Sequence, residues 1–227
     1  MELKKGGNPI NASDWKAALR IVREDGSELS PGGITLDMTT FEDNGITYVA
    51  WSDRVNWGAT KTMIATIDPV KPWKLTSEPV QISLSEYGWD RRNTPVNEGP
   101  YIVKHNGKIY MAISGSAVDN TYSIGFIVTN TGIDLLNPTS WERIGYPSLT
   151  SEFVPGYYGT GHNSFTIDEY GQVLNVYHAR PEDGGRSSTL RIVHFSVDGT
   201  PVLDMTPERE ILPENRLVSA KIIVKDR

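Results

Sequence analysis

The sequence predicts an all-β fold, a β-propeller assembled from blades of four strands. Three observations carry this prediction: a turn-rich composition, a unit that recurs about every 60 residues, and a loop with Asn-Pro or Asp-Pro ahead of a tryptophan that recurs with it. The 227 residues include 21 glycines and 14 prolines, which separate short runs rich in Val, Ile, Thr, Tyr and Phe. Such runs are typical of strands joined by turns.

Three hairpins form the first half of the repeated unit. Their turn glycines, Gly45, Gly107 and Gly171, are 62 and 64 residues apart, and each stands between two strand-like runs. In a propeller the first strand of each blade lines the central axis. The spacing therefore predicts three equivalent inner hairpins, over residues 34–51, 99–113 and 162–178.

The recurring loop opens the second half of the unit. It reads NPINASDWK at 8–16, DPVKPWK at 68–74 and NPTSWE at 137–142. We expect its tryptophans, Trp15, Trp73 and Trp141, to pack within the blades. A short strand is predicted after each loop, at 19–22, 79–83 and 142–147.

Further strands are predicted within 188–204 and at 218–224. Residues 1–227 then form a single domain of about three and a half blades. Because a ring needs at least four blades to close, the sequence predicts an incomplete propeller, the C-terminal part of a larger one. A β-sandwich with coincidental spacing is the alternative.

Charge and composition bound the function. The net charge is −6 with no basic tract, so neither nucleic acid nor an anionic membrane is an expected partner. There is no cysteine, which excludes thiol catalysis. No apolar run approaches the roughly 20 residues of a membrane span. The start, MELKKGGNPINASDW, lacks the apolar middle of a signal peptide, so we expect either a cytoplasmic protein or a fragment of a secreted parent.

Three titratable residues stand at the start of the three inner hairpins: Asp37, Glu98 and His162. Taken singly, each can be interpreted without a catalytic role: Asp37 as an aspartate that bonds its own turn, Glu98 as a solvated loop charge and His162 as a structural histidine. Their shared place in the repeat predicts instead that they meet at the axis. Two carboxyl groups held close together cannot easily ionise at once, so one is expected to donate a proton while the other stays charged. This is the layout of acid-assisted glycoside cleavage.

The hairpin sequences LDMTTFEDNGITYVAWS, NEGPYIVKHNGKIYMAISGS and GTGHNSFTIDEYGQVLNVYHAR resemble glycoside hydrolase family 43. The resemblance covers about residue 8 to about residue 204. It implies a five-bladed propeller that removes arabinofuranose or xylose from plant polysaccharides with inversion. The combination of motifs looks most similar to arabinofuranosidase-like members.

The resemblance also implies roles for the three axis residues. Glu98, in EGP, matches the general acid that protonates the leaving oxygen. Asp37, in LDMTTFE, matches the aspartate that tunes and orients that acid. His162, in GHNSF, matches a histidine near the axis that contacts substrate and often stands beside a bound ion such as calcium. No organic cofactor is implied.

Three further residues are implied to bind the arabinose- or xylose-containing glycan. Arg186, in GRSSTLRIVHF, resembles an arginine that reaches the sugar from the last blade. Trp51 and Trp89 are expected as aromatic platforms for a sugar ring. Glycans are therefore the expected partners.

One departure from the family matters. The family's general base is an aspartate near its N-terminus, and neither Asp14 nor Asp25 fits that position. We therefore expect the base to be absent from this chain and the chain alone to be weak or inactive. Two other possibilities stay open: a non-catalytic sugar-binding propeller, and a truncated product that pairs with itself or with a separate N-terminal piece through exposed blade edges.

Overall fold

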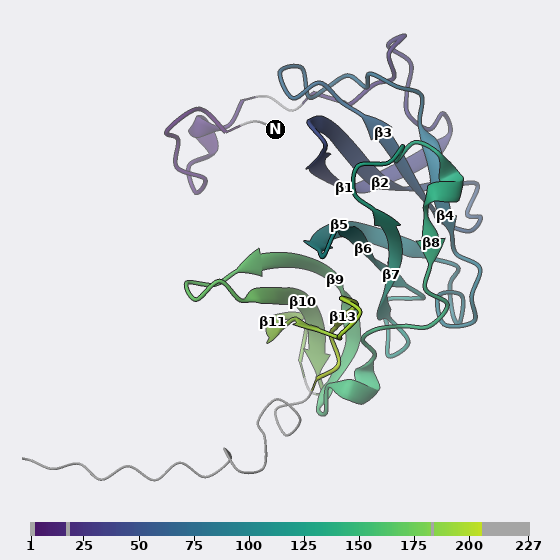
Figure 1. Ribbon diagram of the computed structural model, residues 1–227, viewed down its shortest axis with the longest axis vertical. Coiled ribbons are helices and arrows are strands. Elements are labelled where there is room, and N and C mark those ends of the chain that lie inside the picture. The colour runs from purple at the N-terminus through teal and green to yellow at the C-terminus, as the bar shows by residue number, and fades with distance from the viewer. Residues whose placement is uncertain (1–2, 17–18, 183, 206–227) are drawn as a thin grey trace, which may run out of the picture.

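The computed structural model describes residues 3–16, 19–182 and 184–205, and it contains three successive antiparallel sheets arranged along an arc (Figure 1). The first sheet has the order β1-β2-β3-β4, the second β5-β6-β7-β8, and the third β11-β10-β9, with a small β12-β13 ladder beside it. The all-β prediction and the blade-by-blade arrangement are confirmed, and the sandwich alternative is wrong.

The strands of the first two sheets are β1 (Gly33–Asp43), β2 (Ile46–Val55), β3 (Lys61–Thr66), β4 (Val80–Leu84), β5 (Asn97–His105), β6 (Lys108–Gly115), β7 (Ser123–Asn130) and β8 (Glu142–Arg143). Those that follow are β9 (Tyr157–Ile167), β10 (Val173–Pro181), β11 (Ser187–Ile192), β12 (His194–Phe195) and β13 (Pro201–Val202). Three short 3₁₀ helices are η1 (Ala12–Asp14), η2 (Pro138–Ser140) and η3 (Ser151–Phe153). In the described part of the chain no helix is long and apolar enough to cross a membrane.

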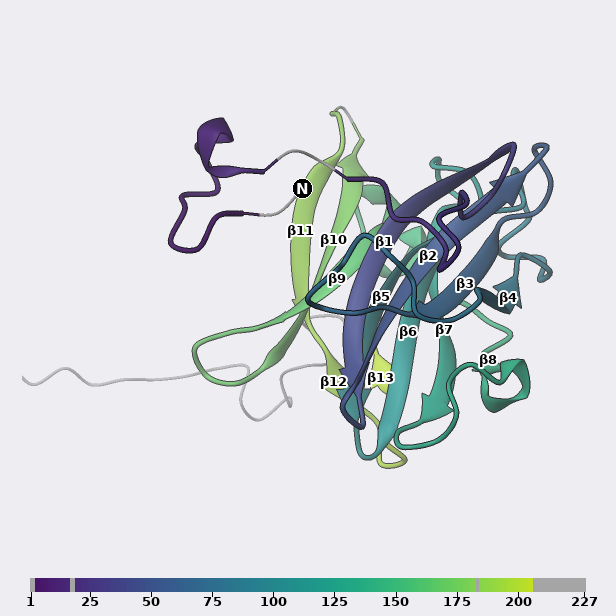
Figure 2. The ribbon, with the colours of Figure 1, turned by 90° about the horizontal axis from the view of Figure 1, so that it is seen from above.

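The three predicted inner hairpins are β1–β2, β5–β6 and β9–β10. The first two close through Asn-Gly turns in which Asn44, Gly45, Asn106 and Gly107 all have positive φ. That backbone matches the twist of the flanking strands, and Asn and Gly adopt it at least cost. The first strands of the hairpins, β1, β5 and β9, lie side by side on the inner side of the arc (Figures 1 and 2).

Apolar side chains fill the spaces between neighbouring sheets. One cluster joins the first sheet to the second and includes Ile64, Met111 and Ile127. Another joins the second sheet to the third and includes Phe126 and Tyr177. The strand alternation explains this, because successive residues of a strand point to opposite faces, so the second sheet packs against a neighbouring sheet on each side.

The first recurring loop does not lead into a strand as expected. In the predicted strand at 19–22, only Val22 forms isolated β-bridges, while Ile21 packs onto the apolar cluster on the outer face of the first sheet. The loop motif itself does recur. The Trp15 indole donates to Pro9 O at 3.0 Å, and the Trp141 indole donates to Leu135 O at 2.9 Å.

The remaining local predictions had mixed outcomes. Trp141 is buried as expected, whereas Trp73 is 39% exposed, so a packing role for Trp73 is wrong. The strand predicted at 142–147 is reduced to β8. Residues 218–224 lie outside the described residues.

Candidate active site

A β-bulge interrupts each of the three inner strands at the same place. The pairing shifts between Leu36 and Thr39 in β1, between Glu98 and Tyr101 in β5, and opposite Val176 and His178 in β9. A bulge leaves two residues facing one on the partner strand and redirects their side chains. All of the predicted axis residues lie in or beside these bulges.

Inside the bulges, Asp37, Gly99 and His162 occupy equivalent positions with φ values of 59°, 62° and 50°. Glu98 therefore precedes the common position by one residue, and its assignment to the same repeat position as Asp37 and His162 was wrong. The cause is the third hairpin turn, which is longer than a two-residue Asn-Gly turn, so the residue nine before Gly171 matches the residues eight before Gly45 and Gly107. Positive φ in a non-glycine residue is strained, and such strain concentrates at functional sites.

The bulge geometry brings Asp37 and His162 together. Asp37 Oδ1 lies 3.6 Å from His162 Nε2, and the Asp37 side chain is 20% exposed against 42% for His162. Asp37 Oδ2 accepts a hydrogen bond from the backbone N–H of Gly99 at 3.3 Å. A Cβ atom at Gly99 would stand 3.2 Å from the His162 ring. Asp37 is thus held at the residue that directly follows Glu98.

Glu98 is held by a tyrosine that the repeat did not indicate. The hydroxyl of Tyr122 donates to Glu98 Oε1 at 2.6 Å and lies 3.4 Å from His162 Nδ1. Tyr122 is fully buried just before β7, and a Cβ atom at Gly161 would stand 2.1 Å from its ring. Only glycine therefore fits at position 161. Glu98, Tyr122, His162 and Asp37 form one continuous set of contacts, as the sequence predicts for the three titratable residues.

Burial, followed by the negative charge of Glu98, raises the pKa of Tyr122 well above its ordinary value. Tyr122 therefore remains a hydroxyl donor at any physiological pH. Tyr122 lies in the loop between the second and third strands of its blade, where the repeat has no recurring residue. The one feature of the sequence that reflects Tyr122 is Gly161, in GTGHNSF, which leaves room for its ring.

A second histidine, His178 on β10, lies behind this set. Its ring stacks on Tyr122 with centroids 5.4 Å apart and planes 10° apart. Burial lowers the pKa of His178 to about 4, and the positive charges of Arg186, His162 and Arg180 act in the same direction. His178 is thus neutral at neutral pH.

The predicted glycan-binding residues fall into different surroundings. Arg186 is exposed just before β11 and near enough to His178 to affect its pKa, which agrees with a side chain that is free to reach a ligand. Trp51 is fully buried in the apolar cluster on the outer face of the first sheet. Its prediction as a sugar platform is wrong, because no face of the ring is open.

Trp89 is half-buried and packs tightly. Its ring lies where a Cβ atom at Gly115 or Gly125 would approach within 2.6 Å, and the Arg143 guanidinium is 5.4 Å from its centroid. Its role in sugar binding stays a prediction.

The residues around His162 do not make a calcium site by themselves. Calcium takes six to eight oxygen ligands, and His162 offers a ring nitrogen next to one carboxylate. Among the residues that the structure describes, no group of three or more His, Cys, Asp or Glu side chains is placed to hold a metal ion. A calcium ion near His162 stays a prediction, and no chemical step is routed through it.

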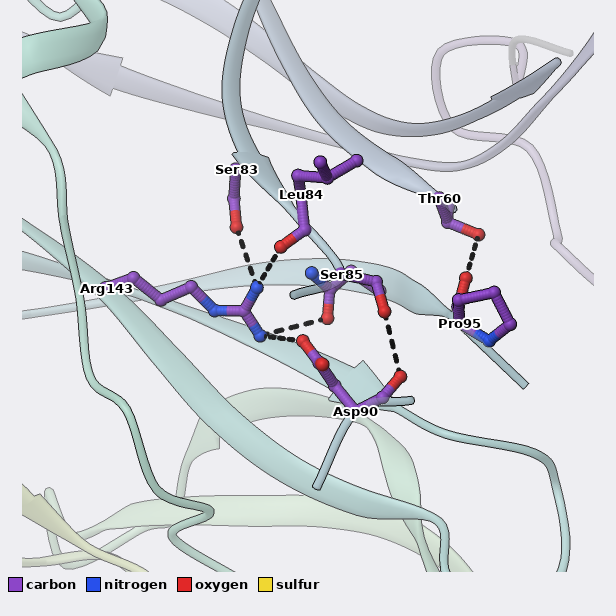
Figure 3. A network of polar contacts seen from close by, with 8 residues as sticks. Thr60, Ser83, Leu84, Ser85, Asp90, Pro95 and Arg143 are labelled. Carbon is purple, nitrogen blue, oxygen red and sulfur yellow. Dashed lines mark hydrogen bonds and ion pairs between the residues drawn. The ribbon is translucent and has the colours of Figure 1, made fainter. Parts of the chain in front are cut away.

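Three aspartates that could be asked to act as the general base, Asp14, Asp25 and Asp90, are engaged elsewhere. Asp14 accepts from the Asn8 amide at 3.0 Å and Asp25 from the Ser27 amide at 2.8 Å, both within exposed turns. Asp90 is fully buried and pairs with Arg143 (Figure 3). None of the three stands at the axis with Glu98.

Asp90 belongs to a polar network that runs from the outer strands to the start of β5, where Asn97 Oδ1 accepts from Arg143 at 3.2 Å. The Arg143 guanidinium, on β8, donates to Asp90, to the backbone carbonyl of Leu84 on β4, and to Ser83 Oγ at 3.3 Å (Figure 3). It also lies 5.0 Å from the Tyr87 ring centroid. This network ties the outer strands of the first two blades together.

Comparison with known proteins agrees with this architecture. The model of the family "Glycosyl hydrolases family 43" matches residues 9–201. The chain belongs to this family, whose solved members are five-bladed β-propellers.

Individual relatives are arabinofuranosidases by name. The chain is 34% identical over 205 residues to an extracellular exo-α-(1→5)-L-arabinofuranosidase of Streptomyces avermitilis, covering 86% of this chain and 41% of the relative. It is 31% identical over 207 residues to α-L-arabinofuranosidase 43 of Humicola insolens, covering 86% and 42%. The crystal structure of α-L-arabinofuranosidase from Lactobacillus brevis superposes with a TM-score of 0.77 at 30% identity, covering 86% of this chain and 62% of that chain.

The chain therefore spans about two fifths of the length of the curated relatives that it matches. The described strands are correspondingly an incomplete set of propeller blades.

Proposed function

We propose that this chain carries the proton-donating part of an inverting glycoside hydrolase that releases arabinofuranose or xylose from plant polysaccharides or their oligosaccharides. The observation that carries the proposal is the contact set Glu98–Tyr122–His162–Asp37 at the inner strands. Names of the Streptomyces and Humicola relatives favour arabinofuranosides over xylosides. The word extracellular in the Streptomyces names favours a secreted parent protein.

In this proposal Glu98 is the general acid. It gives its proton to the glycosidic oxygen as the bond to the anomeric carbon breaks, and it is left as a carboxylate. Asp37 holds the Gly99 amide, the peptide group next to Glu98, and so fixes the approach of the acid. Arg186 and His162, both exposed, contact the sugar.

Inversion also needs a carboxylate that takes a proton from the attacking water on the other face of the sugar. We propose that this base lies outside residues 1–227, since Asp14, Asp25 and Asp90 are engaged elsewhere. The chain alone is then a poor catalyst, because general acid–base assistance is typically worth about 10²–10⁴-fold per group.

The test compares this chain with one extended to the full propeller length of its relatives. Both are assayed on aryl α-L-arabinofuranoside and aryl β-xyloside, and the anomer first released is followed by proton NMR. We expect turnover by the extended chain only, with inverted product. Equal rates for the two chains would contradict the absent base, and retained configuration would contradict the inverting mechanism. An extended chain that binds arabino-oligosaccharide without turnover would favour the sugar-binding alternative.

A further inference from the structure

The contact between Tyr122 and Glu98 bears on which of the two carboxyl oxygens of Glu98 can donate a proton to the substrate. A tyrosine hydroxyl has one proton to donate. Tyr122 donates this proton to Glu98 Oε1 at 2.6 Å. The protonated oxygen of a carboxyl group is the weaker acceptor of the two, so a bond donated to Oε1 favours the carboxyl proton on Oε2.

We propose that Tyr122 is a positioning residue for Glu98, which fixes Oε1 through its hydroxyl and leaves Oε2 as the oxygen that delivers the proton. The inference rests on the proposed function of Glu98 as general acid. In the reaction the Oε2 proton moves to the glycosidic oxygen, the electrons of the broken C–O bond stay on that oxygen, and a water supplies the new bond to the anomeric carbon. The proton of that water goes to the second carboxylate of the proposed function.

The surroundings of Tyr122 hold the phenol ring in one place. It is fully buried, it fills the space left by the absent side chain of Gly161, and it stacks on His178. The interaction with Glu98 therefore costs little additional ordering when substrate binds. A group that is already in place before the reaction stabilises charge more effectively than one that must reorganise.

The Tyr122 hydroxyl also distinguishes the charged from the neutral form of a carboxyl group. A hydroxyl that donates to a carboxyl oxygen bonds more strongly to the charged form than to the neutral form. Removing the hydroxyl should therefore make Glu98 hold its proton to higher pH. The other groups that face this pair are Asp37 on β1, His162 on β9, His178 on β10, and Arg186, which acts through His178.

The first experiment is a ¹³C NMR titration of the Glu98 carboxyl in this chain and in Tyr122→Phe, which keeps the ring and removes the hydroxyl. Since a hydrogen bond to a charged group shifts a titration by about one pH unit or more, we expect the midpoint in Tyr122→Phe to rise by about that amount. The matched control is Tyr110→Phe, because Tyr110 is buried in the same sheet and its hydroxyl has no hydrogen-bond partner among the described residues. A folded Tyr122→Phe with an unchanged midpoint would overturn the proposal.

If Tyr122→Phe does not fold, Glu98→Gln decides the question. In the unmodified chain the Tyr122 Cζ resonance should titrate with the Glu98 midpoint, and in Glu98→Gln that titration should disappear. A Tyr122 resonance that ignores Glu98 would overturn the proposal.

Activity of the extended chain separates this inference from the function on which it rests. Tyr122→Phe should lower kcat on poor leaving groups, leave KM nearly unchanged and move the basic limb of the pH profile upward. A lowered kcat with an unmoved basic limb would contradict the positioning role. If the NMR shift appears but the unmodified extended chain has no turnover, the Tyr122–Glu98 contact stands and the proposed hydrolase function fails.

Discussion

Asp90 and Glu98 lie eight residues apart in the chain, and the structure treats their carboxyl groups in opposite ways. Asp90 is fully buried and is paired with the guanidinium of Arg143. Glu98 is partly exposed at the inner strands and accepts from the neutral hydroxyl of Tyr122. Among the described residues, no lysine or arginine forms an ion pair with Glu98 or Asp37.

A second pair of carboxylates repeats the contrast. Asp43, at the far end of β1, accepts from Lys104 Nζ at 2.8 Å and from the Gly132 amide at 2.7 Å, both in the next blade. Asp37, on the same strand, accepts from the Gly99 amide and faces His162. A fixed cation beside a carboxylate favours its charged form, which suits a structural ion pair and not a proton donor. Asp90 and Asp43 therefore serve stability, and Glu98 and Asp37 can serve chemistry.

The largest effect on stability is expected from Arg143→Met. It leaves Asp90 buried without a cation, which typically costs about 3–5 kcal/mol in the free energy of unfolding. Urea denaturation measures this loss. The control is Arg20→Met, which breaks the exposed pair with Glu28 and should cost less than about 1 kcal/mol. Similar losses of unfolding free energy in Arg143→Met and Arg20→Met would contradict a structural role for the Arg143 network.

A smaller effect is expected from Asp43→Asn. It keeps an acceptor for the Gly132 amide but loses the charged bond to Lys104, so we expect a loss of about 1–2 kcal/mol in the free energy of unfolding. The partner variant Asp37→Asn should lose less than about 0.5 kcal/mol, because its amide oxygen can still accept from Gly99. Urea denaturation again measures both losses. Greater destabilisation by Asp37→Asn than by Asp43→Asn would reverse the comparison.

An effect of another kind is expected on the pH dependence of stability. The pKa of His178 is lowered to about 4 in the folded chain, against about 6.5 when unfolded. Between these values the unfolded state binds more protons, so stability falls as the pH drops from about 6.5 to about 4. Melting temperatures across this range should show a smaller slope in His178→Phe, which keeps a ring against Tyr122. An unchanged slope would show that His178 does not set it.

The sequence predicted most of the blades and half of the site. Period and turn chemistry located the inner hairpins, because an Asn-Gly turn and an alternating strand are local features. Asp37, Glu98 and His162 followed from the repeat. The offset of Glu98 by one residue from the position of Asp37 and His162 could not be predicted, because the bulges and the longer third turn are visible only in the strand pairing.

Contacts between distant segments explain the other failures. Tyr122 reaches Glu98 from a loop with no repeat signal, and Trp51 is buried by residues near the N-terminus rather than open to a sugar. Side-chain exposure depends on what packs above a strand, and a motif alone does not carry that information. The Arg143–Asp90 pair joins residues 53 apart and was likewise not foreseen.

The central claim, that Glu98 donates the proton, is tested most directly by the leaving-group dependence of Glu98→Gln in the extended chain. On an arabinofuranoside with a poor leaving group, the variant should lose about 10²–10⁴-fold in kcat/KM. On a substrate with an activated leaving group, which needs little protonation, most of that loss should disappear. The exposed residue Glu86 supplies the control, Glu86→Gln, which should match the unmodified protein on both substrates. An equal loss on the two substrates for Glu98→Gln would contradict the account, because a missing proton donor must matter most where the leaving group is worst.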